Sequence, residues 1–317
     1  MNIGLDMMGG DFAPEEAVKG VRIFLEKSPP DVSMTLVGDP ARLAPLLETE
    51  APDRSRYQVA PSRDIIGMHE HPTRALKSKP ESSIAVGFQL LQQKKIDAFI
   101  SAGNTGAMLV GALYTIDSIP GIQRPTIATI IPKGEGKFGL LLDVGINADC
   151  KAENLVQFAI LGTHYARQIL KISVPRVALL NIGEEEGKGN LLCQAAYPLL
   201  KSCPLIHFTG NAEGRDLFND RADVIVCEGF TGNVVLKMAE SIFDIVQKRK
   251  IRDAYLDQFN FEQYGGTPLL GVNEPVIIGH GISKAAAFRQ MIDLATEVIR
   301  TRLLDRIRES FIQQDPS

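Results

Sequence analysis

Short apolar runs alternate along the chain with loops rich in glycine and asparagine. Several runs are apolar throughout, such as FGLLLDV at residues 138–144, which is typical of strands covered on both faces. The pattern predicts strands at residues 2–5, 34–37, 57–60, 98–100, 126–131, 138–144, 176–182, 205–209, 222–227 and 275–278.

Amphipathic segments at helical spacing follow most of these runs. We expect helices from residue 14, around 43–47, and over 82–93, 107–110 and beyond, 151–170, 190–199, 234–258 (one helix or two) and 285–311. Residues 64–80 are expected to form a mixed loop, and 264–271 contain too much glycine for a helix. Repeated strand, loop and helix predict an α/β fold, a mostly parallel sheet sandwiched by helices.

Ligands of such sheets bind at the carboxyl ends of the strands. We therefore expect the loops that follow the strands to gather at one edge and to carry the functional residues. The polar residues of these loops are Asn104, Asp143, Asn147, Asn181, Lys188 and Asn233.

The segment DAFISAGNTGAM, residues 97–108, has the clearest local pattern. It predicts a strand, a turn of small residues and a helix, so free backbone N–H groups and the helix dipole point at the turn. Gly103 lets a ligand approach the backbone, and Ser101, Asn104 and Thr105 add polar side chains. The pattern predicts an anion site, although an ordinary connection capped by Asn104 fits it equally well.

The composition is typical of a globular protein with a large hydrophobic core. The 317 residues are 44% hydrophobic and 23% charged, enough for a large core in one domain or two close-packed lobes. A net charge of -4 argues against nucleic-acid binding. The cysteines, at positions 150, 193, 203 and 227, lack metal-ligand spacing and indicate reduced thiols in a cytosolic protein. Neither a signal peptide nor a membrane span is expected.

Several motif matches fail on their context. Residues 134–139 fit G-x-G-x-x-G but precede a strand, and residues 183–189 have the wrong spacing and charge for a phosphate-binding P-loop. His69 and His71 lack an obvious third metal ligand, and no serine-hydrolase elbow is present. The remaining asparagines, glycines and helix N-termini suit a small oxyanion and a polarised carbonyl, with no metal, cofactor or protein nucleophile.

A set of segments, in order, resembles the PlsX family of bacterial phosphate acyltransferases. They are LDMMGGDFAP, SAGNTGA, LLDVGINADC, LLNIGEEEGKGN, GNAEGRD, CEGFTGNVVLK, YGGTPLLGV and GHGIS. The resemblance implies reversible transfer of a fatty acyl group from acyl carrier protein to inorganic phosphate, which forms acyl phosphate for phospholipid synthesis. It also implies one three-layer α/β/α domain over residues 1–317, similar to phosphate acetyltransferases and isocitrate/isopropylmalate dehydrogenases. A cytoplasmic homodimer, associated peripherally with the membrane, is the implied assembly.

On this basis we expect phosphate to bind the Ser101–Thr105 turn and to attack the thioester carbonyl directly. Asn181, Lys188 or Asn233 would stabilise the oxyanion, and His280 or Lys188 would protonate the sulfur. Asn104 is a further catalytic candidate, Asp143 would orient Lys188 or Asn147, and Gly232 would lie beside the substrate. For each residue the alternative is a role in loop architecture, and for Asp143 it is a cap on the next helix. A second route would use an acyl-cysteine at Cys150 or Cys227.

The sequence departs from the family pattern in three places. His280-Gly281-Ile282-Ser283 has one hydroxyl fewer than the usual HGSS, and His69 and His71 stand where acidic residues are expected. The helical protrusion at 234–264 is shorter than usual, between positions 238 and 263. Its basic residues contact anionic lipid or acidic acyl carrier protein in one interpretation, and form the solvated end of a dimer-interface helix in the other. They are Lys248, Arg249 and Arg252.

Three other functions stay open at this point. A phosphate acetyltransferase would use the same chemistry with acetyl-CoA as donor. A dehydrogenase of the isocitrate type would need a carboxylate cluster for a divalent metal, which the sequence does not offer. A non-catalytic module that binds lipid or carrier protein would release no thiol in response to phosphate.

Overall fold

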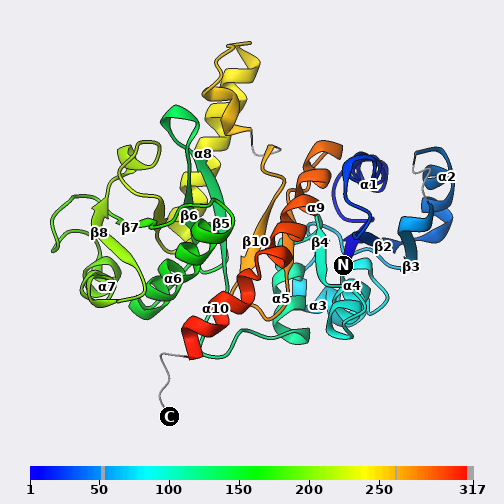
Figure 1. Ribbon diagram of the computed structural model, residues 1–317, viewed down its shortest axis with the longest axis horizontal. Helices are drawn as coiled ribbons and strands as arrows, with labels where there is room; N and C mark the ends of the chain where they lie inside the picture. Colours follow the sequence, from blue (N-terminus) through cyan, green and yellow to red (C-terminus); the bar gives the residue numbers. More distant parts are fainter. Residues whose placement is uncertain (51–53, 261–262, 313–317) are drawn as a thin grey trace. The chain divides into compact units, whose positions relative to one another are not determined.

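The computed structural model describes residues 1–50, 54–260 and 263–312. Its contacts divide the chain into two compact units, Met1–Ser118 with Glu262–Arg300 and Ile119–Phe261 with Thr301–Ser317. Strands and helices alternate in both units (Figure 1). The single domain over 1–317 with its protrusion at 234–264 stays a prediction, and positions 261–262 of that protrusion lie outside the described residues.

Among the described residues, the first unit contains six strands in the order β3-β2-β1-β4-β11-β10. They are β1 (Asn2–Asp6), β2 (Ser33–Gly38), β3 (Tyr57–Pro61), β4 (Ala98–Ser101), β10 (Gly266–Leu270) and β11 (Val276–Gly279). Neighbours are parallel except for β10 and β11. The chain builds outward from β1 to β3 and then places β4 on the other side of β1. The carboxyl ends of β1 and β4 therefore flank a topological switch point, where open α/β sheets bind ligands.

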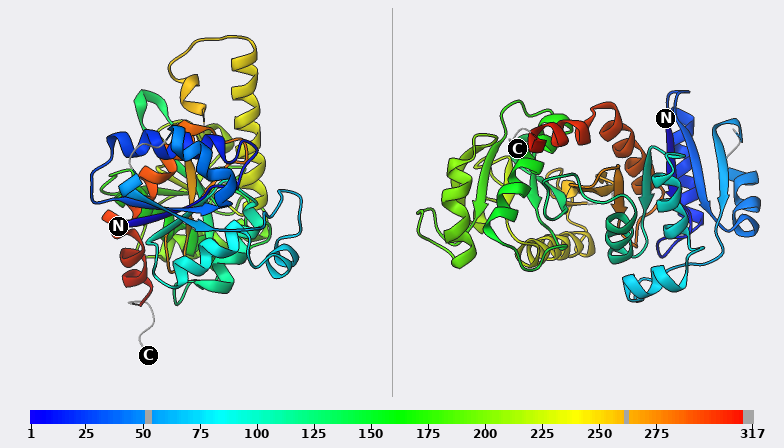
Figure 2. Two further views of the ribbon diagram at one scale, coloured as in Figure 1. Left: turned by 90° about the vertical axis from the view of Figure 1, so that its right-hand side faces the viewer. Right: turned by 90° about the horizontal axis from the view of Figure 1, so that it is seen from below.

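Helices cover both faces of this sheet (Figure 2). One face carries α1 (Glu15–Lys27), α2 (Pro40–Glu50) and α9 (Ala285–Arg300), and the other α3 (Pro72–Ser78), α4 (Ser83–Gln92) and α5 (Thr105–Thr115). Ala98 and Ile100 of β4 belong to the core beneath α1 and α9, whereas Phe99 packs edge-on against Phe88 of α4 with ring centroids 5.2 Å apart. Alternate side chains of β4 thus enter opposite layers, as the period of a strand requires.

In the described part of the second unit there are five strands, in the order β5-β6-β9-β7-β8. They are β5 (Thr126–Pro132), β6 (Phe138–Leu142), β7 (Arg176–Leu180), β8 (His207–Ala212) and β9 (Val224–Val226), parallel except for β5 and β6. On one side lie α6 (Ala152–Gln168), α7 (Leu191–Ser202) and α10 (Leu303–Ile312), and on the other α8 (Gly229–Lys248). Gly162 of α6 lets the helix approach Val224, while Leu141 and Ile225 share a core with Val235 of α8.

The predicted α/β class, with mostly parallel strands between helices, is confirmed, but several local predictions are wrong. The helix or helices expected over 234–258 end at Lys248 except for a short 3-10 turn at Leu256–Phe259, and strand β10 was not predicted. Residues 64–80 are not only a loop, because α3 begins at Pro72; seven residues are too few to produce a periodic pattern. The helix expected over 285–311 is two helices, because Arg302 adopts a positive φ of 55° between α9 and α10. The apolar stripe continues through this break, since Leu303 is fully buried, and therefore conceals it.

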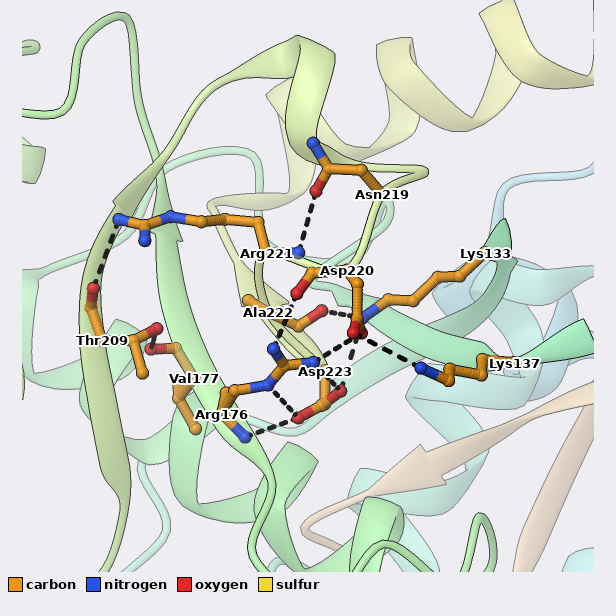
Figure 3. Close-up of polar contacts among 10 residues, drawn as sticks. All are labelled: Lys133, Lys137, Arg176, Val177, Thr209, Asn219, Asp220, Arg221, Ala222 and Asp223. Atoms are coloured by element: carbon orange, nitrogen blue, oxygen red, sulfur yellow. Dashed lines mark hydrogen bonds and ion pairs between the residues drawn. The ribbon is translucent and has the colours of Figure 1, made fainter. Parts of the chain in front are cut away.

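A charged cluster lies at the amino-terminal ends of β7 and β9, where Arg176 and Asp223 meet (Figure 3). Arg176 donates to the Asp223 carboxylate from its backbone N–H at 2.8 Å and from its guanidinium at 3.0 Å. Lys133, which is buried, donates to the carbonyl oxygen of Ala222 and lies 3.5 Å from Asp223 Oδ1. The exposed Asp220 accepts from Arg176 at 2.6 Å.

These contacts oppose the effect of burial on the pKa of each buried member, and at Asp223 they outweigh it. Burial raises the pKa of Asp223, but hydrogen bonds from Arg176 and the charge of Lys133 outweigh it and hold that pKa at about 2. Burial lowers the pKa of Lys133, and the Asp223 charge opposes this shift. The cluster therefore stabilises the fold while Asp223 is ionised.

We predict that Asp223→Asn lowers the free energy of unfolding at neutral pH by about 2 kcal/mol, since the Asp223 pKa falls from 3.8 to about 2 on folding. A carboxyl group whose pKa is lower in the folded state stabilises the protein at pH values above its pKa in the unfolded chain. The advantage over the variant should be lost as pH falls, with about half of it gone near pH 3. Denaturant titrations across this pH range measure the difference.

Asp220→Asn is the matched control, because the Asp220 side chain is 56% exposed against 12% for Asp223. A surface ion pair should contribute less than about 1 kcal/mol. Equal losses in the two variants, or an Asp223→Asn difference that does not change with pH, would contradict the interpretation.

Candidate active site

In the first unit, the buried carboxylate of Asp6 connects the loops that follow β1 and β4. Its Oδ1 accepts hydrogen bonds from the N–H groups of Met8 and Gly9 at 2.9 and 3.1 Å, and its Oδ2 accepts from the Ser101 hydroxyl at 2.7 Å. Ser101 Oγ in turn accepts from the Gly103 N–H at 3.0 Å. Burial raises the pKa of Asp6, and these hydrogen bonds oppose the shift.

Glycine lets these loops approach one another at the switch point. A Cβ on Gly9 would lie 2.7 Å from the backbone nitrogen of Gly103, closer than real Cβ atoms come. The N–H of Asp11 donates to the carbonyl oxygen of Gly281 at 2.7 Å, which brings the loop after β11 and its His280 to the same edge. The first unit thus gathers the predicted residues Ser101, Gly103 and His280.

Asn104 is the N-cap of α5, as one sequence interpretation held. Its Oδ1 accepts from the Ala107 N–H at 3.0 Å. Its Nδ2 donates to the carbonyl oxygens of Gly67, Met68 and Glu70 at 3.0, 3.2 and 3.0 Å, so it also fastens the loop before α3. Asn104 therefore positions two loops, and its catalytic role stays a prediction.

The N-terminus of α5 offers backbone donors for an anion. The N–H groups of Thr105 and Gly106 belong to the first helical turn, where no intrahelical acceptor exists. Thr105 is exposed, and the positive end of the helix dipole lies at this turn.

In the second unit, the buried carboxylate of Asp143 organises the loop after β6. Its Oδ2 accepts from the backbone N–H and side-chain amide of Asn147 at 2.6 and 2.9 Å, and its Oδ1 accepts from the Ile127 N–H at 3.2 Å. Burial raises the pKa of Asp143 against these hydrogen bonds. Asp143 thus contacts Asn147, one of the two expected partners, and does not cap α6, which begins at Ala152.

The N-terminus of α8 lies directly against this loop. A Cβ on Gly232 would stand 1.9 Å from the Asp143 carbonyl oxygen, so only glycine permits the approach. Gly145 has a φ of +133° and lies beside the Asn233 side chain, which is exposed. Asp143, Asn147, Gly232 and Asn233 are therefore neighbours, as the strand-end argument predicts.

Asn181, after β7, holds the loop that carries Lys188. Its Nδ2 donates to the Lys188 carbonyl oxygen at 3.1 Å, and its Oδ1 accepts from the Ile182 N–H at 2.8 Å. The Lys188 side chain is half exposed, and its Nζ lies 4.0 Å from the Glu185 carboxylate. This long surface contact leaves the ammonium group able to meet a ligand.

Two acidic residues of these loops, Asp6 and Glu228, have contacts that the sequence did not predict. Glu228 caps α8, because its Oε2 accepts from the Thr231 N–H at 2.8 Å. Each lies just after an apolar run and shortly before glycine, which is the signal that identifies such residues. Their partners lie on other segments or one turn ahead, so sequence spacing alone does not assign their contacts.

The cysteine and histidine alternatives find little physical support. Burial raises the pKa of Cys150 to about 11 and that of Cys227 well above its ordinary value, so both are thiols at neutral pH, whereas the thiolate is the nucleophile. Within the residues that the structure describes, no three histidine, cysteine, aspartate or glutamate side chains are arranged to hold a metal ion. His69 and His71 are exposed.

The fold resembles that of phosphotransacetylases. The EutD phosphotransacetylase from Staphylococcus aureus superposes with a TM-score of 0.64 at 17% identity, covering 94% of each chain. A phosphotransacetylase from Streptococcus pyogenes gives 0.62 at 18% identity, covering 96% of this chain and 94% of the other. These likenesses confirm the fold predicted from the sequence.

Sequence comparison identifies the family. The family model described as "Fatty acid synthesis protein" matches residues 1–254. The phosphate acyltransferases of Dictyoglomus turgidum and Heliobacterium modesticaldum are 42% and 44% identical over 329 residues, which cover 98% of this chain and 97% of each relative. The chain therefore belongs to the phosphate acyltransferase family, as the motifs along its sequence predict.

Proposed function

We propose that this protein transfers a fatty acyl group from acyl carrier protein to inorganic phosphate and so forms acyl phosphate for phospholipid synthesis. The observation that carries the proposal is family membership over nearly the whole chain, with phosphate acyltransferases as relatives. The donor-rich loops at the carboxyl ends of the strands support the same chemistry.

Phosphate binds, in this proposal, at the turn between β4 and α5. The unpaired N–H groups of Thr105 and Gly106 and the helix dipole attract an anion there. Asp6, Ser101 and Asn104 hold the turn by hydrogen bonds, so the donors need not reorganise when phosphate arrives. Phosphate is already an oxyanion at neutral pH, and its attack therefore needs no strong general base.

The loops of the second unit act on the thioester. Asn181, Lys188 and Asn233 are the proposed donors to the carbonyl oxygen, where negative charge develops as a phosphate oxygen bonds to the carbonyl carbon. The C–S bond then breaks, and the sulfur takes a proton from His280 or Lys188. Asp143 and Asn147 position the surrounding loop. No electron transfer occurs, and the scheme uses no cofactor.

We predict that thiol release from acyl carrier protein loaded with a long acyl chain depends on added phosphate. Lys188→Gln should lower kcat/KM by about a hundredfold, as loss of an oxyanion donor does. Lys201→Gln is the matched control, because Lys201 is an exposed lysine that pairs with Glu186 of the same loop, and it should leave the rate unchanged. A colorimetric thiol assay measures both variants.

Other outcomes of that assay identify the alternatives. Thiol release without phosphate would indicate a hydrolase. Efficient release from acetyl-CoA in place of the carrier-protein substrate would indicate a phosphate acetyltransferase. The absence of any release, together with carrier-protein binding, would indicate a binding module.

The exposed face of α8 carries residues that suit a homodimer contact and, beside it, a contact with anionic lipid or acyl carrier protein. One stripe carries four apolar side chains that are about half exposed: Val234, Met238, Ile242 and Ile245. An exposed apolar stripe on a helix is typical of a protein–protein interface. We therefore assign this stripe to the contact between the two subunits of a homodimer. The exposed basic residues Lys248, Arg249 and Arg252 follow it and suit anionic lipid or acidic acyl carrier protein. No helix in the described part of the chain is long and apolar enough to cross a membrane.

Reversing Lys248, Arg249 and Arg252 to glutamate should abolish flotation with anionic vesicles, because each basic residue near such a surface contributes about 1 kcal/mol. The sedimentation coefficient should remain that of a dimer, since the apolar stripe is unchanged. Neutral vesicles are the control. Undiminished flotation of the variant, or a dimer that dissociates, would contradict this division of roles.

A further inference from the structure

A pocket of about 270 Å³ lies in the second unit at the carboxyl end of β7. We call it the inner pocket. Most of its wall is apolar, and Leu155 and Leu179 in that wall are almost fully buried. It lies between β7, α6, α7 and the N-terminus of α8, and its lining residues are Leu155, Leu179, Leu180, Asn181, Ile182, Gly189, Asn190, Leu192, Cys193, Cys227, Glu228 and Thr231.

A second, more open hollow adjoins the inner pocket. It shares Asn190, Leu192 and Glu228 with the inner pocket and adds Leu191 and Phe230, among others. We call it the outer hollow. Leu192 therefore lies on the wall common to both.

The rim of the two cavities exposes large apolar side chains. Ile182 is 80% exposed, Leu191 85% and Phe230 66%. Ile182 lines the inner pocket, and Leu191 and Phe230 line the adjoining outer hollow; exposed apolar side chains of this kind mark a ligand groove. An apolar ligand that entered between them would cover the rim and fill the inner pocket together.

The polar groups select the kind of apolar ligand. Glu228 is one of the lining residues, and its carboxylate accepts a hydrogen bond from the N–H of Thr231, another lining residue, so an anionic group is disfavoured nearby. Asn181, a proposed donor to the thioester carbonyl, also lines the inner pocket. A chain whose carbonyl lies at Asn181 would therefore enter with its uncharged end first.

We propose that the inner pocket and the outer hollow bind the hydrocarbon chain of the acyl donor and set the preference for chain length, an assignment that rests on the proposed function. The inner pocket lies just below the range of about 300–1,000 Å³ typical of small-molecule sites, so it takes only part of a long chain. The remainder lies along the outer hollow. Each methylene that leaves water should strengthen binding about fourfold.

Substitutions of different side-chain size at position 192 test the proposal. Leu192→Trp should reduce the space in both cavities at their shared wall. It should therefore lower kcat/KM for hexadecanoyl carrier protein by about tenfold or more relative to butyryl carrier protein. Leu192→Ala should shift the preference toward longer chains. Ala195→Trp is the matched control, because Ala195 is exposed on the same helix and lines neither cavity, and its chain-length profile should equal that of the parent.

A binding readout separates this proposal from the function on which it rests. A fluorescent polyene fatty acid should bind the parent protein and Ala195→Trp, and should bind Leu192→Trp about tenfold or more weakly. This pattern without any acyl transfer would refute the proposed function and leave the chain site intact. Unchanged profiles and unchanged probe binding across the position-192 series, with folded variants by circular dichroism, would overturn the chain site while the transfer assay stands.

Discussion

Hydrogen bonds from backbone N–H groups to two buried carboxylates, Asp6 in the first unit and Asp143 in the second, hold the loops that carry the candidate residues of each unit. Each aspartate stands at the carboxyl end of a strand. Asp6 accepts from main-chain donors of the loop that follows it, and Asp143 accepts from Asn147 of its loop and from Ile127 of β5. A carboxylate without such donors is costly to bury, so the fold must keep these loops closed around it. The donors that remain for a substrate are thereby fixed before it binds, which is the condition for electrostatic stabilisation of a transition state.

The glycines of the family motifs let the same loops pack closely around the two carboxylates. Gly9 admits the backbone of Gly103, and Gly232 admits the carbonyl of Asp143, at distances that exclude any side chain. The polar residues of the motifs divide accordingly. Asn104 and Asn147 use their amides to hold backbone, whereas Lys188 and Asn233 are exposed and remain available to a ligand.

The sequence was sufficient for the parts of the fold that depend on local pattern. Apolar runs predicted every strand except β10, and Asn104 was one expected cap of α5. Contacts between segments that are distant along the chain could not be predicted from the sequence. Asp6 and Ser101 are 95 positions apart, and Asn104 lies 34 to 37 positions from the residues that it contacts in the loop before α3. The inner pocket draws on segments from Leu155 to Thr231, so its shape exists only in the folded chain.

The difference in unfolding free energy between Asp143→Asn and Asp6→Asn tests the central role of these donors most directly. Both oxygens of Asp143 accept from N–H groups, so an amide in either orientation directs its NH₂ at a donor. Asp6 Oδ2 faces the hydroxyl of Ser101, which can accept instead. We predict that Asp143→Asn costs about 1–3 kcal/mol more than Asp6→Asn. Equal costs, or a larger cost at Asp6, would contradict the account.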